Sequence, residues 1–123
     1  MFDKNLVRSM LIEIDQAIGK ISFRTAKIES PDYFTNSPEG AERLDGIAML
    51  FLAIGESLKG IDKITGGAFL KKYPEIDWAG IKGFRDIIAH HYFDIDADQV
   101  FWICRHNLGP LSEVVRRMIK EME

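Results

Sequence analysis

The sequence contains a single cysteine, Cys104, and no long uninterrupted apolar run. One cysteine cannot form an internal disulfide, which excludes a disulfide-stabilised scaffold and makes a reducing cytosol the expected compartment. No stretch approaches the about 18–20 apolar residues of a membrane helix. Residues 1–5 also lack the charged-then-apolar order of a signal peptide. The sequence therefore predicts a cytoplasmic protein without a membrane-spanning segment.

An excess of basic residues is also absent. Sixteen Lys and Arg stand against 19 Asp and Glu, which gives a net charge of −3 at pH 7. Indiscriminate binding to polyanions needs a strongly basic surface, so no DNA partner is expected, although a small basic pocket remains compatible with this charge. The 123 residues, 46% of them apolar, are enough to bury one core. We predict a single helical domain over residues 1–123.

Strand-like alternation is missing, and apolar residues instead recur every three or four positions. This spacing predicts helices over about 3–28, about 38–60 and from about 77 to 91–93, and a fourth helix after Asp96. Gly109-Pro110 is expected to break this last helix. The expected N-caps are Ser37, Asp77 and Asp96. The predicted fold class is all-α, an antiparallel up-and-down bundle.

The second predicted helix is apolar on more than one side. Met49, Leu50 and Leu52 lie outside its main apolar stripe. A helix of this kind is either central in the bundle or part of a dimer interface. Gly55-Glu56 interrupts the apolar run, and glycine lowers helix propensity. We therefore expect Gly55 to mark a close approach of another helix.

Residues 85–92, with the sequence RDIIAHHY, concentrate the groups that carry chemistry. Arg85 can stabilise charge on a phosphate, and His90 can move protons near neutral pH, which together suffice for metal-free cleavage of a phosphodiester. Asp86 and His90 are four residues apart, so we expect them on one helix face within hydrogen-bonding reach. Arg85 and His90 are about 140° apart on an ideal helix. They share a site if the helix ends near His90, or if a two-fold dimer combines residues of two chains.

Simpler explanations of this segment stay open on spacing alone. Residues 85–90 can cap a helix end and pair with one another in solvent, and Tyr92 can be an ordinary amphipathic boundary residue. A metal site formed by His90, His91 and Asp94 is a further alternative. Its spacing is not that of a zinc motif.

The pattern Arg85-x4-His90-x-Tyr92 resembles the signature of the HEPN superfamily (higher eukaryotes and prokaryotes nucleotide-binding), specifically its HepT toxin branch. The broken last helix is also similar, so the resemblance covers essentially the whole chain. Two residues depart from the branch: Asp86 stands where Asn is frequent, and Asp77 stands where Pro is frequent. Three further segments are similar to it, namely 54–56, 73–78 and 93–96.

The resemblance implies a HEPN bundle of four to five helices that forms a homodimer, with the motif helices meeting at a cleft. It also implies a metal-independent endoribonuclease, often a toxin, that needs no cofactor. In that chemistry His90 deprotonates the 2′-OH or protonates the leaving 5′-oxygen, Arg85 stabilises the phosphorane, and Asp86 orients His90. Glu56 and His91 are further candidates for the cleft. The substrate is RNA, and the product ends in a 2′,3′-cyclic phosphate.

The resemblance further implies a partner, a minimal nucleotidyltransferase antitoxin of the MntA type. It transfers AMP to the tyrosine of the motif, here Tyr92, and a higher assembly with the antitoxin is open. Phosphates added beside Arg85 and His90 block an RNA phosphate by occupancy and repulsion. The alternative from a different class is a non-catalytic HEPN module that binds the nucleotidyltransferase or presents its substrate. The presence of Arg85, His90 and Tyr92 together favours the enzyme.

Overall fold

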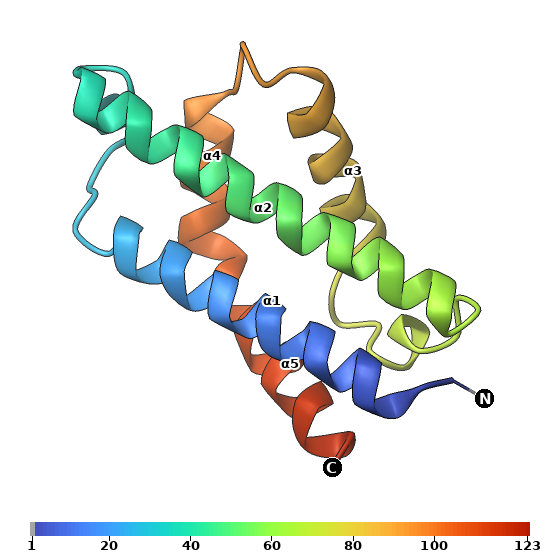
Figure 1. Ribbon diagram of the computed structural model, residues 1–123. Helices are drawn as coiled ribbons and strands as arrows, with labels where there is room; N and C mark the ends of the chain where they lie inside the picture. The colour runs from blue at the N-terminus through green and yellow to red at the C-terminus, as the bar shows by residue number, and fades with distance from the viewer. Residues whose placement is uncertain (1) are drawn as a thin grey trace.

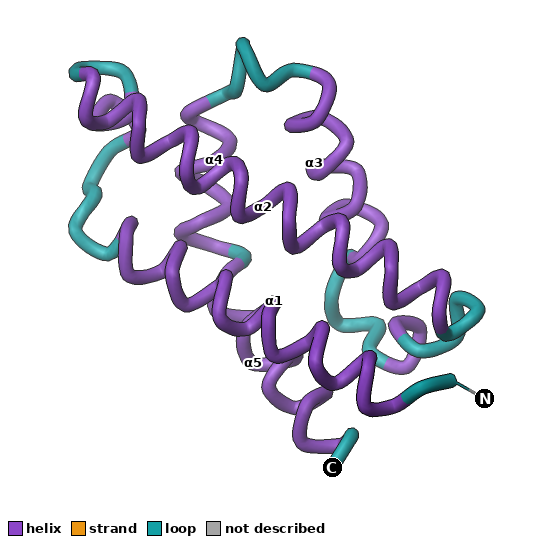
Figure 2. The backbone as a smooth tube through the Cα atoms, viewed as in Figure 1, coloured by secondary structure: helices purple, strands orange, loops and turns teal. Residues whose placement is uncertain are grey.

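The computed structural model describes residues 2–123, which form helices joined by short loops and contain no strand (Figure 2). Helices α1 and α2 lie side by side and antiparallel, and the chain then rises along α3 and returns along α4 and α5 (Figure 1). The all-α antiparallel prediction is confirmed. The α-helices are α1 (Lys4–Thr25), α2 (Pro38–Ile64), α3 (Trp78–His90), α4 (Ala97–His106) and α5 (Leu108–Glu121), with 3-10 turns η1 (Pro31–Phe34) and η2 (Leu70–Lys72).

Helix α2 is the centre of the packing, because it contacts α1, α3 and η1. This supports the first of the two alternatives that its apolar excess predicted, a central position in the bundle, and the dimer interface stays a prediction. Its buried residues recur at helical spacing and meet those of α1 in one core. Full burial of each Leu or Ile side chain contributes about 1.5–3 kcal/mol. The least exposed aliphatic side chains of the two helices are Val7, Leu11, Ile14, Ile21, Ile47, Ile54, Leu58 and Ile61.

The three predicted N-caps are confirmed. The side chains of Ser37, Asp77 and Asp96 each accept a hydrogen bond from the backbone N–H three residues later, at 3.0, 2.9 and 3.2 Å. Each bond pairs an N–H group that the first turn of a helix leaves without a partner. Helix α2 runs four residues beyond the predicted end, and the chain then turns through Gly66 and Gly67, whose φ angles of 65° and 78° suit glycine.

The last helical segment is broken, as predicted, but at a different residue. The interruption lies at Asn107, between α4 and α5, and Gly109-Pro110 falls in the first turn of α5. Proline is tolerated there because the N–H it lacks would have no partner within the helix. As a result α4 packs on η1 and α5 packs on α1. No helix in residues 2–123 is both long enough and apolar enough to cross a membrane.

Gly55 is a point of close approach between α2 and α3. A Cβ atom added at Gly55 would lie 2.3 Å from the Cβ of Arg85 and 2.6 Å from its Cγ. These atoms lie next to the α3 backbone, so a rotation of the Arg85 side chain alone cannot relieve the overlap. The expected close approach at Gly55 is confirmed, and its neighbour is the arginine of the motif.

We predict that Gly55→Ala destabilises the protein by about 1–3 kcal/mol, because α3 must move away to accommodate the methyl group. Gly83→Ala in α3 is the matched control, since an added Cβ there meets no atom within 4 Å. The better helix propensity of alanine is expected to stabilise that variant by up to about 1 kcal/mol. Urea unfolding of both variants measures the difference. Equal stabilities would show that the α2–α3 contact relaxes without loss.

Candidate active site

Helix α3 is anchored by one buried residue near each of its two ends. Trp78 is buried at its first turn, and the indole Nε1 donates a hydrogen bond to the Tyr73 carbonyl at 2.9 Å. Ile88 is buried near its last turn, whereas Ile81 and Phe84 are only partly buried. These contacts fix the face of α3 that meets α2. Arg85 lies on that face, and its side chain is only 24% exposed.

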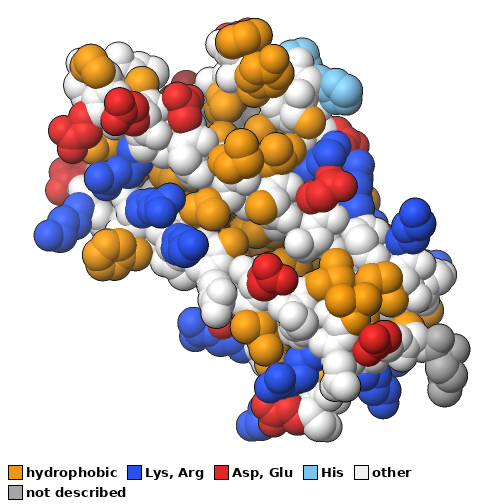
Figure 3. Space-filling model, in the orientation of Figure 1, with side chains coloured by type: hydrophobic (Ala, Val, Ile, Leu, Met, Phe, Trp, Pro, Cys, Tyr) orange, Lys and Arg blue, Asp and Glu red, His pale blue; other side chains and the backbone are white. Residues whose placement is uncertain are grey.

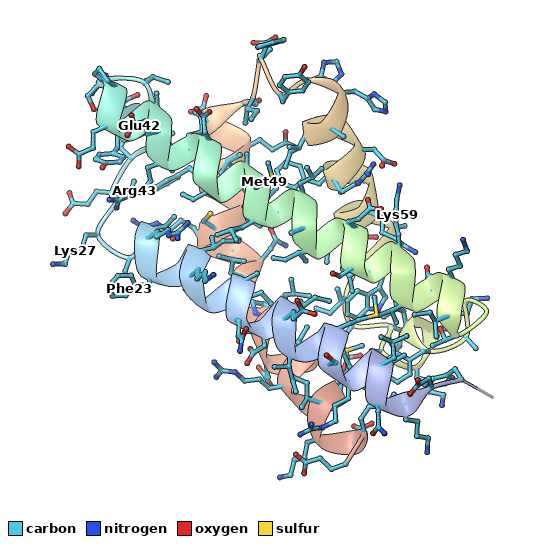
Figure 4. The ribbon with its side chains drawn as sticks, viewed as in Figure 1. Phe23, Lys27, Glu42, Arg43, Met49 and Lys59 are labelled. Carbon is cyan, nitrogen blue, oxygen red and sulfur yellow. The ribbon has the colours of Figure 1, made fainter. Side chains whose placement is uncertain are left out.

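The Arg85 guanidinium joins a cluster of four charged groups from α2 and α3. Its Nη2 lies 2.5 Å from the Glu56 carboxylate, and its Nη1 donates to the Asp86 carboxylate at 3.0 Å. The Asp86 carboxylate also accepts a bond from the Lys59 ammonium at 2.7 Å. Lys59 extends from α2 toward α3 (Figure 4). We call Glu56, Lys59, Arg85 and Asp86 the charged cluster.

The pKa values of two groups follow from these bonds. The hydrogen bond from Lys59, followed by that from Arg85, lowers the pKa of the Asp86 carboxyl below its usual value. The bond to Asp86 is the main cause that raises the pKa of Arg85, and Glu56 adds to it. Both groups are therefore charged at neutral pH, with the cation of Arg85 held between two anions.

Asp86 does not bond to His90, contrary to expectation. Four-residue spacing puts both side chains on one side of α3, but Lys59 from α2 and the neighbouring Arg85 occupy the carboxylate. His90 is the exposed last residue of α3. Asp86 is therefore bound by Lys59 instead of His90. Spacing within one helix cannot reveal this contact, because Lys59 belongs to another helix.

Arg85 and His90 do not converge within one chain. Helix α3 ends at His90, as the first alternative required, but His90 is still helical, so its side chain leaves the axis about 140° from that of Arg85. Arg85 faces α2, and His90 faces solvent. A site that uses both groups therefore requires either a local change at the end of α3 or a second chain.

Tyr92 lies on the same groove as Arg85. This groove, of about 530 Å³, runs between α2 and the segment that follows α3, and its lining includes Met49, Leu52, Tyr92, Phe93 and Arg85. Met49, Tyr92 and Phe93 are 62, 61 and 93% exposed. Figure 3 shows apolar side chains gathered at the top of the molecule beside histidines, and Met49 projects from the middle of α2 in Figure 4. We call the groove lined by these residues the motif groove.

The two further cleft candidates are separated. Glu56 belongs to the charged cluster. His91 instead lines a small hollow of about 80 Å³ between α3 and α4, with Ile87 and Gln99. Within residues 2–123, no three or more His, Cys, Asp or Glu side chains are arranged to hold a metal ion, which does not favour the His90, His91 and Asp94 alternative.

Lys59 is the site residue that the sequence reading missed. Glu56 and Lys59 are three residues apart on α2, which places them on one helix face. The spacing indicates that the two side chains lie together. The sequence does not indicate that this face of α2 meets α3. Lys82 of α3 and Asp62 of α2 form a second ion pair across the same two helices.

Two features away from the motif offer no competing chemistry. A hollow of about 400 Å³ between α2, α3 and the α4–α5 junction is lined mainly by apolar side chains. Its acids are already engaged, Glu75 with Arg117 and Asp77 with the N-terminus of α3. Burial raises the pKa of the Cys104 thiol to about 11, so at neutral pH it is not the thiolate that a nucleophile requires.

Three known proteins similar to this chain are named as putative ribonucleases. Putative RNase MJ0127 and Putative RNase MJ0125 of Methanocaldococcus jannaschii are each 30% identical to this chain over 70 residues, which are 57% of this chain and 54 and 57% of theirs. This chain thus spans little more than half the length of these two relatives. Putative RNase MJ1216 of the same organism is 27% identical over 96 residues, or 73% of this chain and 76% of its own. No solved structure matches.

A family model described as "Ribonuclease HepT-like" matches residues 11–118, a range that includes the central helix, the charged cluster and the whole Arg85-x4-His90-x-Tyr92 pattern. On the strength of that match, the chain belongs to the HepT-like ribonuclease family.

Proposed function

We propose that this protein is an endoribonuclease of the toxin type that cleaves RNA without a metal ion. The observation that carries the proposal is the position of Arg85, a cation fixed at a groove beside Tyr92, in a chain of a ribonuclease family. A guanidinium held in this way is suited to stabilise the charge that develops on a phosphorane. His90, exposed at the end of the same helix, is accessible for proton transfer.

The proposed reaction needs only groups that the motif and the RNA supply. The 2′-oxygen forms a bond to phosphorus as its proton passes to a base, and the bond from phosphorus to the 5′-oxygen breaks as that oxygen takes up a proton. The products are a 2′,3′-cyclic phosphate and a 5′-hydroxyl. His90 is the proposed proton carrier and Arg85 the proposed stabiliser of the phosphorane. In our proposal Asp86 positions Arg85 through its bond at 3.0 Å, a revision of the role expected from spacing.

We further propose that two chains complete the site. Within one chain Arg85 and His90 diverge around α3, and the motif groove exposes Met49, Tyr92 and Phe93 on the side of Arg85. Apolar side chains exposed together on one side favour association with another protein surface. We propose a two-fold pairing of two such surfaces in which the arginine of one chain lies near the histidine of the other.

We predict that the purified protein cleaves single-stranded RNA in excess EDTA. His90→Ala is expected to lower the rate roughly 10²- to 10⁴-fold through loss of proton transfer. Arg85→Ala is expected to lower it roughly 10²- to 10³-fold through loss of charge stabilisation. Gel analysis of the RNA and identification of its 3′ ends measure both effects.

His106→Ala is the matched control for this experiment, because His106 is an exposed histidine on α4 that stacks on Trp102. It is expected to cleave like the unmodified protein. Cleavage that survives both motif substitutions would contradict the assignment of Arg85 and His90. Folded protein that cleaves no RNA would instead support the alternative, a non-catalytic HEPN module that binds a nucleotidyltransferase or presents its substrate.

We predict that the two inactive variants restore each other. Co-expressed Arg85→Ala and His90→Ala chains form mixed dimers in which one site takes its arginine and its histidine from different chains. Random pairing makes half of the dimers mixed with one of their two sites intact, so activity is expected at about a quarter of the normal level. A site built within one chain would stay inactive in every such mixture. Light scattering measures the mass of the particles in solution, and a dimer mass is the independent readout of association.

We propose an MntA-type nucleotidyltransferase as the antitoxin partner and Tyr92 as the residue that accepts AMP from it. Tyr92 is 61% exposed, and it shares the motif groove with Arg85, so added phosphates would lie where the substrate phosphate is needed. Incubation with such an enzyme and ATP is expected to add AMP to this chain and to abolish cleavage. Mass spectrometry locates the group. Modification that persists in Tyr92→Phe would exclude Tyr92 as the acceptor.

A further inference from the structure

The Arg85 guanidinium has little free hydrogen-bonding capacity for a phosphate. Nη2 pairs with Glu56 at 2.5 Å, and Nη1 pairs with Asp86 at 3.0 Å. Nε is buried and has no partner, so a ligand that arrives from solvent does not reach it. Arginine usually binds a phosphate through two nitrogens, and each terminal nitrogen here already has a carboxylate partner. A phosphate therefore competes with an acid of the protein itself.

The two acids differ in how firmly they are held. Asp86 has a second cation, because Lys59 donates to its carboxylate at 2.7 Å. Glu56 has no ionic partner other than Arg85 among residues 2–123. The Glu56 side chain is 61% exposed, against 46% for Asp86. Glu56 can therefore turn into water while Asp86 stays bound to two cations.

Arg85 itself is not free to move. The base of its side chain lies against the backbone at Gly55, where even an added methyl group would overlap with it. Its side chain is 24% exposed, so rotation into solvent would give up this packing. When an anion approaches, the group that moves is Glu56 rather than the guanidinium.

We propose that the Glu56 carboxylate competes with the RNA backbone for Arg85, and that a substrate phosphate binds the guanidinium by displacing it. This inference rests on the proposed ribonuclease function. The two cations and two anions of the charged cluster sum to zero, so the resting site presents no net positive charge to RNA. The site thus selects an anion that can replace a carboxylate on Arg85. It discriminates against polyanions that bind only through a net positive charge.

The test compares Glu56→Gln with its matched control in a His90→Ala background, where RNA stays intact. Glutamine keeps the size of the side chain and can still accept a bond from Arg85, but it lacks the charge that opposes a phosphate. The control is Asp62→Asn, because Asp62 pairs with Lys82 across the same two helices and its loss changes net charge equally. Fluorescence anisotropy with a fluorescein-labelled single-stranded RNA oligonucleotide gives the dissociation constants.

Glu56→Gln is expected to tighten RNA binding about two- to fivefold at low salt, the range typical of one exposed ion pair. The gain shrinks as salt rises, and Asp62→Asn stays near the parent. An equal gain in both variants would mean that net charge alone is responsible and would overturn the proposal. Weaker binding by Glu56→Gln would also overturn it, because Glu56 would then serve to position Arg85.

The outcome for the proposed function is read separately, from the unmodified protein in EDTA. Cleavage there together with unchanged RNA affinity in Glu56→Gln overturns only the competition by Glu56. Absence of both cleavage and RNA binding overturns the ribonuclease proposal and this inference with it. Thermal unfolding of Glu56→Gln beside the parent establishes that each measured affinity belongs to folded protein.

Discussion

The contact between Gly55 and Arg85 determines how α2 and α3 meet. Without a side chain at position 55, the base of Arg85 lies directly on α2, and the guanidinium reaches the level of Glu56. One turn further along α2, Lys59 reaches Asp86. The motif groove depends on the same crossing, because Arg85 is part of its lining. A larger residue at 55 would change the spacing of the helices and all of these contacts together.

The charged cluster matters more for the position of its side chains than for the stability of the fold. Exposed ion pairs contribute little free energy, because water screens them and ordering the side chains opposes their formation. The bond that Arg85 donates to Asp86, together with the packing at Gly55, instead fixes the direction of one guanidinium between two helices. Directional control of this kind is what charge stabilisation of a transition state requires, since the donor must be in place before the charge develops. Glu56 pairs with the other terminal nitrogen of the same guanidinium, which is the nitrogen that a phosphate takes over in the proposed displacement.

Local features of the fold were predictable because their causes lie within a few residues. The apolar period of three to four gave the helices, and short polar side chains gave the caps at Ser37, Asp77 and Asp96. The break before α5 was predicted but placed at Gly109-Pro110, because a proline can begin a helix as well as end one. The glycine at position 55 was an equally local signal, and only its neighbour was unknown.

The side-chain contacts of the site were harder to predict because they join separate helices. Spacing within α3 paired Asp86 with His90, but Lys59 lies 27 positions earlier in the chain and takes that place. No pattern within one helix states which face of another helix it will meet. The divergence of Arg85 and His90, by contrast, followed from helical geometry alone, and it depended only on α3 continuing to His90.

The packing of α1 on α5 has a consequence for the order in which the chain folds during synthesis. Helices α1 and α2 are adjacent in the sequence, so they can pair early as a helical hairpin. The residues of α5 that complete the core, among them Val115 and Met118, are made about 100 positions after the middle of α1. Until α5 leaves the ribosome, apolar side chains of α1 remain open to water and to other chains. In a nascent chain of this protein, the segment most exposed to aggregation is therefore α1, the helix that is made first.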